Sequence, residues 1–284
     1  MTYVDRTVES ADGLSLHLRD YSGPSEDAPV VLCLHGLTRN ARDFAAVAES
    51  LRRRFRVVVM EQRGRGQSQH DANPANYQLS TYVGDTARAL NALNIDRVSV
   101  LGPSMGGLMG MLMAAQPDTP VRALVLNDVG PVVEADGIAR IQSYVGKGPQ
   151  AGDWNDAAAA ARATNGSAFP EWQQEDWLAF ARNLYRENTE GQPVLDYDPA
   201  IATPLNEAPE TAAPADLWPV FDRISVPTLV IRGALSDILS AATVREMARR
   251  KPDLVPVEVP GRGHAPMLDE AVARDAIETF LESF

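Results

Sequence analysis

The sequence predicts an α/β protein built on a mostly parallel, eight-stranded sheet, with helices on both faces and a helical insertion. Three observations support this fold class. Short apolar runs alternate with amphipathic segments along most of the 284 residues, which is typical of βαβ units. Several runs are apolar throughout, as expected for strands buried on both faces of a parallel sheet. The alternation stops after Gly130-Pro131 and resumes at Ile224, which indicates an insertion.

The individual elements follow in order along the chain. Strands at residues 2–9 and 14–21 flank Asp12-Gly13, a strong hairpin signal. The apolar run Val30–Leu34 is the first buried strand. Further strands are expected at residues 56–60, 97–101, 121–127, 228–232 and 255–259, and helices at 43–53, 81–93, 241–250 and 269–284, with another after Ser104. These segments give eight strands in total.

The predicted insertion covers residues 131–218 and divides the core into residues 1–130 and 219–284. It contains all four tryptophans of the chain: Trp154, Trp172, Trp177 and Trp218. Two interpretations of these tryptophans remain open. They either pack a small helical subdomain, or one or two of them line a binding cleft.

Composition limits the classes of function. The chain has 26 Lys and Arg against 38 Asp and Glu, for a net charge of −12. This charge argues against binding to nucleic acid or to anionic membranes. The first residues lack the layout of a signal peptide, and no apolar stretch approaches the ~18 residues of a spanning helix. The single cysteine, Cys33, lies in an apolar run and forms no internal disulfide. A cytoplasmic enzyme is expected, and the oligomeric state is not predicted.

The clearest motif is G-x-S-x-G at residues 102–106, which follows a predicted strand and precedes a predicted helix. In this context the pattern indicates a nucleophilic serine. Ser104 would stand at the apex of a sharp turn in a strained backbone conformation. Side chains at positions 102 and 106 would collide across such a turn, so glycine is required at both.

A serine nucleophile requires a base, and the chain has only four histidines. His17 lies inside the second strand as a surface or half-buried residue, and His70 lies in a polar loop. His35 ends a buried strand, where it shapes the following loop. His264 lies in a glycine-flanked loop after the last strand, where open α/β sheets form their sites. His264 is therefore the predicted base.

Two carboxylates are candidates for the acid that orients this base. Asp237 follows the strand at residues 228–232, next to the strand that leads to His264. Asp128 ends the strand at residues 121–127. Asp237 is favoured because it keeps the chain order Ser, Asp, His with the acid beside the base strand. Asp128 is the alternative acid, or else a hydrogen-bonding cap where the chain enters the insertion.

Acyl transfer also requires main-chain donors for the developing oxyanion. The Met105 N–H is one, because it begins the helix after the nucleophile. The Leu37 N–H, in the turn after His35-Gly36, is the second candidate.

Taken together, these motifs resemble the α/β-hydrolase superfamily over nearly the whole chain outside the insertion. The matching segments are His35-Gly36 (oxyanion loop), Gly102–Gly107 (nucleophile elbow), Glu61–Ser68 (D-x-R-G-x-G-x-S loop), and Asp237 and His264 (acid and base). Two residues depart from the family pattern: Pro103 replaces the commoner His or Gln, and Glu61 replaces Asp. The resemblance implies that the insertion forms a cap over the active site.

The predicted activity is hydrolysis of a carboxylic ester or lactone through an acyl-enzyme on Ser104, with a small apolar acyl substrate. Alternatives with the same triad are carbon–carbon bond hydrolysis of a dienoic diketone and cofactor-free perhydrolysis. A ligand receptor with a degenerate site is the alternative of a different class. No cofactor or metal is expected, since no histidine pair or cysteine cluster has ligand spacing. Arg39 and Arg63 are expected to be structural or solvated.

Overall fold

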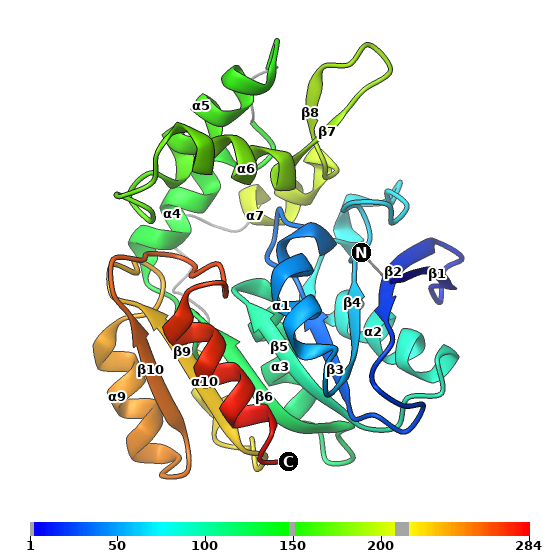
Figure 1. Cartoon of the computed structure of the whole chain (residues 1–284), viewed down its shortest axis with the longest axis vertical. Helices are drawn as coiled ribbons and strands as arrows, with labels where there is room; N and C mark the ends of the chain where they lie inside the picture. Colours follow the sequence, from blue (N-terminus) through cyan, green and yellow to red (C-terminus); the bar gives the residue numbers. More distant parts are fainter. Residues whose placement is uncertain (1–2, 148–150, 208–215) are drawn as a thin grey trace.

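The computed structural model describes residues 3–147, 151–207 and 216–284. Its central sheet contains eight strands in the order β1-β2-β4-β3-β5-β6-β9-β10 (Figure 1). The strands are β1 (Val4–Glu9), β2 (Ser15–Tyr21), β3 (Val30–Leu34), β4 (Arg56–Met60), β5 (Val98–Pro103), β6 (Val121–Asn127), β9 (Thr228–Gly233) and β10 (Val255–Val259). β2 pairs antiparallel with β1 and β4, and the other pairings are parallel. The predicted sheet is therefore confirmed.

Helices cover both faces of this sheet and bury an apolar layer on each. One layer joins the sheet to α1 and α10, which lie in front of it in Figure 1. The other joins the sheet to α2, α3, α8 and α9. The bounds are η1 (Ala41–Phe44), α1 (Ala45–Leu51), η2 (Pro74–Asn76), α2 (Leu79–Ala92), α3 (Met105–Ala114), α8 (Trp218–Phe221), α9 (Ala241–Arg250) and α10 (Ala271–Leu281). Helices on both faces are what strands apolar on both sides require.

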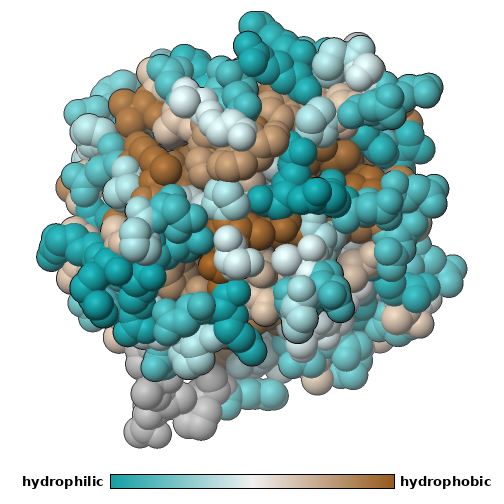
Figure 2. All heavy atoms as spheres, turned by 90° about the horizontal axis from the view of Figure 1, so that it is seen from below, coloured by the Kyte–Doolittle hydropathy of each residue, from teal (hydrophilic) through white to brown (hydrophobic). Residues whose placement is uncertain are grey.

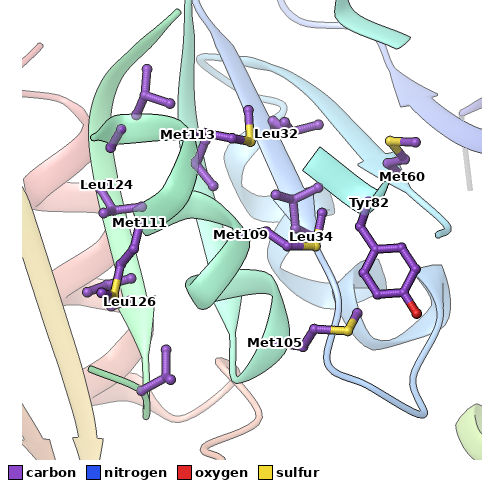
Figure 3. Close-up of a cluster of buried hydrophobic side chains, with 14 of the residues drawn as sticks. Leu32, Leu34, Met60, Tyr82, Met105, Met109, Met111, Met113, Leu124 and Leu126 are labelled. Carbon is purple, nitrogen blue, oxygen red and sulfur yellow. The ribbon is translucent and has the colours of Figure 1, made fainter. Parts of the chain in front are cut away.

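Helix α3 is fixed to the sheet by its methionines. Met109 and Met113 lie beside Leu34 and Leu32 of β3, and Met111 lies beside the leucines of β6 (Figure 3). These methionines are buried, and their flexible side chains fill the irregular space between a helix and a twisted sheet. Burying a side chain of this kind stabilises the fold by roughly 1.5–3 kcal/mol. The residue immediately before α3, Ser104, is thereby held in place.

Residues between β6 and α8 form a separate layer above the carboxyl ends of the strands (Figure 1). It contains α4 (Ala135–Tyr144), α5 (Trp154–Asn165), α6 (Gln174–Leu184), β7 (Tyr185–Glu187), β8 (Pro193–Leu195), η3 (Pro199–Ala202) and α7 (Thr203–Glu207). α5 and α6 share a small apolar core of alanines and aromatic rings. Residues 148–150 and 208–215 of the predicted insertion lie outside the described ranges.

The surface has polar and apolar regions. The face seen in Figure 2 is largely hydrophilic, with smaller apolar patches between polar side chains. Within the described ranges, every helix is too short or too polar to cross a membrane.

Candidate active site

Ser104 occupies the turn between β5 and α3. Its backbone has φ 51° and ψ −122°, a conformation that residues other than glycine rarely adopt. A Cβ on Gly102 would lie 2.3 Å from the Gly106 carbonyl carbon, as expected for so tight a turn. A Cβ on Gly106 would instead lie 1.7 Å from the Leu34 carbonyl oxygen. Gly106 is therefore required because α3 approaches β3 closely, and not because of a collision across the turn.

The structure places His264 beside Ser104. His264 lies in the loop after β10, with Nε2 2.9 Å from the Ser104 Oγ. Its Nδ1 lies 2.8 Å from Oδ2 of Asp128. Because a carboxylate can only accept, Nδ1 carries the proton and Nε2 accepts from the serine hydroxyl. The three side chains therefore form one continuous hydrogen-bond chain.

Asp128 is the carboxylate that contacts His264, which corrects the expectation that Asp237 would do so. Asp128 is fully buried, and it also accepts hydrogen bonds from the Gly233 N–H at 2.8 Å and the Ser236 hydroxyl at 2.6 Å. These hydrogen bonds supply the partners that a buried polar group needs in place of water. Asp128 was the alternative acid in the sequence, and its position directly after β6, the neighbour of β5, lets its carboxylate reach the side of the His264 ring opposite to Ser104.

Asp237 forms an ion pair with Arg140 instead. The Arg140 Nε and Nη2 donate to its two carboxylate oxygens at 2.5 and 2.9 Å. Burial opposes ionisation of Asp237, yet this guanidinium keeps the pKa of the carboxyl below its usual range. Arg140 lies on α4, so the pair joins the inserted layer to the loop after β9. The carboxylate of Asp237 is thus paired with the inserted layer, and its described hydrogen bonds are to Arg140 and not to His264.

His35 orients the predicted oxyanion loop. It is fully buried, and its Nδ1 donates to the Gly36 carbonyl at 2.7 Å while Nε2 accepts from the Gln62 N–H at 2.9 Å. Burial lowers the pKa of His35 to about 4, so the ring is neutral at neutral pH. A trans peptide directs its N–H opposite to its carbonyl. Fixing the Gly36 carbonyl therefore also fixes the direction of the Leu37 N–H.

The other predicted donor, the Met105 N–H, begins α3 and has no acceptor within its own helix. Arg65, for which the sequence predicts no such role, contacts both residues of the predicted oxyanion site. Its Nε donates to the Leu37 carbonyl at 2.9 Å, and its Nη2 lies 4.0 Å from the Met105 Sδ. Arg65 is fully buried and also bonds the Tyr82 hydroxyl. Only the position of Arg65 in the R-G-x-G segment could have indicated this role.

A second contact that the sequence did not reveal holds the His264 loop. The Asn127 amide, at the end of β6, donates to the Pro266 carbonyl at 2.8 Å. Asn127 is buried and lines the same cavity as Ser104 and His264. The end of β6 thus supports the base through Asn127 and through Asp128.

A cavity of about 250 Å³ opens beside Ser104 and His264. Its walls come from the oxyanion loop, α4, α5, α6 and the loop after β10, and its lining is mostly apolar. The lysine, arginine and carboxylate side chains in the lining are Arg39, Asp43 and Lys147. The lining contains no tryptophan among the described residues. Trp154, Trp172 and Trp177 contact rings or an arginine of the inserted layer, and Trp218 contacts Phe221 of α8 and Arg250 of α9, which favours their packing role.

Arg63 is structural, in agreement with its expected role. It is buried and bonds the carboxylates of Asp12, Asp71 and Asp85 at 2.5–2.9 Å. Arg39, in contrast, is half-buried in the cavity wall. His70 is an exposed loop residue, as expected.

His17 differs from its expected surface or half-buried position. It is buried, with Nδ1 2.9 Å from the Glu61 Oε2 and Nε2 2.7 Å from the Asp5 Oδ1. Glu61 also accepts from the main-chain N–H groups of Ala41 and Gln67. Burial opposes protonation of His17, but the two carboxylates outweigh it and raise the pKa of the ring. Burial likewise opposes ionisation of Glu61, yet the His17 hydrogen bond and the main-chain donors lower its pKa.

This pair makes stability depend on pH. A raised histidine pKa contributes fully below its unfolded value of 6.5 and is lost as pH rises through the folded value. The lowered pKa of Glu61 contributes above its unfolded value of 4.5 and is lost at lower pH. We expect the Tm difference between wild type and His17→Gln to be largest at about pH 5–6 and to shrink toward pH 9. Thermal unfolding across this range measures it, and a constant difference would contradict the pairing.

Comparison with known proteins agrees with this architecture. A family model described as the alpha/beta hydrolase fold matches residues 29–271. A 3-hydroxybutyrate-oligomer hydrolase from Cupriavidus necator is 38% identical over 267 residues, covering 91% of each chain. A 2-(acetamidomethylene)succinate hydrolase from Mesorhizobium japonicum is 28% identical over 83% of this chain and 81% of its own.

A solved structure is also similar. The crystal structure of an alpha/beta hydrolase from Novosphingobium aromaticivorans superposes with a TM-score of 0.93, at 44% identity over 99% of both chains. The family match covers most of the chain, and the relative from Cupriavidus necator spans nearly all of it. The chain therefore belongs to the α/β-hydrolase family and is a hydrolase.

Proposed function

We propose that this chain is a serine hydrolase that cleaves carboxylic ester bonds of short hydroxyalkanoate oligomers through an acyl-enzyme on Ser104. The observation that carries the proposal is the hydrogen-bond chain from the Ser104 hydroxyl through His264 to Asp128, with distances of 2.9 and 2.8 Å. The substrate class rests on the similar chain named 3-hydroxybutyrate-oligomer hydrolase.

The proposed mechanism follows from this geometry. Ser104 attacks the acyl carbon as its proton passes to Nε2 of His264, and Asp128 stabilises the resulting imidazolium. The N–H groups of Leu37 and Met105 donate to the oxyanion of the tetrahedral intermediate. His264 then protonates the leaving alkoxide. Water, activated by His264, cleaves the acyl-enzyme to release the carboxylic acid and regenerate Ser104.

The size of the cavity agrees with a short substrate. At about 250 Å³ it lies just below the range of ~300–1,000 Å³ that small-molecule sites occupy. Side chains of α4, α5 and α6 line one part of it, and the oxyanion loop and the loop after β10 line the other. We propose that the inserted layer is the cap predicted from the sequence, and that it restricts entry to short acyl chains.

A fluorophosphonate probe tests the nucleophile. We expect stoichiometric labelling of Ser104 in the folded wild type and none in Ser104→Ala, because only an activated serine reacts. Mass spectrometry of the labelled peptide identifies the site. Absence of labelling in folded wild type would contradict the proposed mechanism and favour the ligand-receptor alternative.

A substrate panel tests the reaction class. It contains a 3-hydroxybutyrate dimer, p-nitrophenyl esters, a lactone and a dienoic diketone. We expect the dimer to have the highest kcat/KM. Turnover of the diketone without ester turnover would instead support carbon–carbon bond hydrolysis, which uses the same triad.

A further inference from the structure

Among the described residues that line the cavity, Arg39 is the arginine, and it lies close to Ser104. Arg39 Cγ and Ser104 Cβ lie 3.3 and 3.8 Å from the point that a Gly36 Cβ would occupy. The arginine therefore begins beside Ser104, and its charged end extends further along the cavity wall. Its side chain is only 15% exposed.

Two neighbours hold this guanidinium in a defined plane. Its Nε and Nη2 each donate to a carboxylate oxygen of Asp43 at 2.5 Å. Its central carbon lies 4.2 Å from the centroid of the Phe180 ring. Stacking and pairing together leave the side chain little rotational freedom.

The pairing with Asp43 uses only one edge of the guanidinium. An arginine has five N–H donors, and the Nη1–Nη2 edge presents a second fork of parallel donors. Within the described residues, Nη1 has no hydrogen-bond acceptor. The surrounding cavity is mostly apolar, and two parallel N–H donors in such a setting bind a planar anion such as a carboxylate best.

The geometry points to a carboxylate-binding site at Arg39, and we propose that it recognises the free carboxylate of the leaving hydroxyacid. This inference rests on the proposed ester hydrolysis at Ser104. In a linear hydroxyacid oligomer, the carboxylate end lies one monomer beyond the last ester bond. The Arg39 fork would hold that end while the ester carbonyl lies over Ser104, so cleavage would release one hydroxyacid from the carboxylate end.

Asp43 and Lys147 modify the charge of this site. The Asp43 carboxylate partly neutralises Arg39 and competes for its donors. Lys147 lies on the same cavity, with its Nζ donating to the Gln142 carbonyl at 3.0 Å. Lys147 is exposed to solvent, where an ammonium is strongly hydrated, so Arg39 is the stronger candidate for carboxylate recognition.

The test compares two matched substrates: a 3-hydroxybutyrate dimer with a free carboxylate and the same dimer ending in a primary amide. Release of the terminal unit is followed by chromatography. We expect wild type to favour the carboxylate by about tenfold to a hundredfold in kcat/KM, as charge-assisted bidentate pairing predicts. In Arg39→Gln this ratio should approach one, mainly through a higher KM for the carboxylate substrate.

Three further variants sharpen the test. Arg53→Gln removes the same charge at an exposed position and should leave the ratio unchanged. Asp43→Asn removes the competing carboxylate and should preserve or increase the ratio. If Arg39→Gln does not fold, Arg39→Lys keeps the charge but lacks the paired guanidinium donors. Its ratio of kcat/KM for the carboxylate over the amide substrate should fall below that of wild type.

The outcomes separate this inference from the proposed function. If wild type cleaves neither dimer nor any other ester, the proposed function fails. If wild type cleaves both dimers with equal kcat/KM, only the carboxylate site is overturned. A wild-type ratio retained in Arg39→Gln but lost in Lys147→Gln would also overturn the assignment to Arg39.

Discussion

Replacing Asp128 by asparagine is expected to lower kcat for ester hydrolysis by about four orders of magnitude. The asparagine would fill the same space, but its amide cannot stabilise an imidazolium, and it favours the wrong tautomer of His264. The loss should appear in kcat and not in KM, because the interaction strengthens only in the transition state. Steady-state kinetics with the dimer substrate measure it.

Asp237→Asn is the matched control for this prediction. It removes the same charge from the neighbouring loop, where the carboxylate pairs with Arg140. Because this pair is partly exposed, its loss should cost no more than about 1 kcal/mol of stability and change kcat by less than about tenfold. If Asp237→Asn were the crippling change and Asp128→Asn were mild, the acid would have to be reassigned to Asp237.

Gly106→Ala is expected to destabilise the fold by about 3 kcal/mol or more. The new methyl carbon would lie 1.7 Å from the Leu34 carbonyl oxygen and 2.5 Å from its carbon. Both are backbone atoms of a central strand, so neither can rotate away. α3 would have to move from β3, and its buried methionines would lose contacts with the sheet. Chemical denaturation measures the free energy of unfolding.

Gly84→Ala, in another helix of the same protein, is expected to stabilise the fold and not to destabilise it. Gly84 lies within α2, and a Cβ there would meet no atom within 4 Å apart from the neighbouring backbone of its own helix. Alanine should therefore stabilise the protein by about 0.5–1 kcal/mol through its better helix propensity. A Gly106→Ala variant as stable as wild type would show that α3 and β3 are more loosely packed than their geometry indicates.

Most of the fold could be predicted because each core element has a strong local signal. The apolar run at Val30–Leu34 and the turn at Asp12-Gly13 need no tertiary information to be interpreted. The position of Ser104 followed from a motif whose glycines have a steric reason that the structure shows directly.

The choice between Asp128 and Asp237 could not be made in the same way. Both carboxylates follow neighbouring parallel strands, so strand order places both near His264. The decision depends on Ser236, which donates to one, and Arg140, which binds the other. Arg140 belongs to the insertion, and no local sequence pattern predicts which core residues an inserted helix contacts. The burial of His17 could not be predicted for a similar reason, because its partner Glu61 lies 44 residues away in the chain and is brought beside it by the pairing of β2 with β4.

The neutral ring of His35 has a consequence for how a pH–activity profile is interpreted. With a pKa of about 4, its protonation state is constant over the range in which most hydrolases are assayed. An acidic loss of activity well above pH 4 therefore reports on other groups of the site, and not on collapse of the oxyanion loop. Below that pH, a charged ring could no longer accept from the Gln62 N–H, and the loop would lose its support. In the proposed mechanism His264 gains and loses a proton during turnover, whereas His35 stays neutral and only supports the loop.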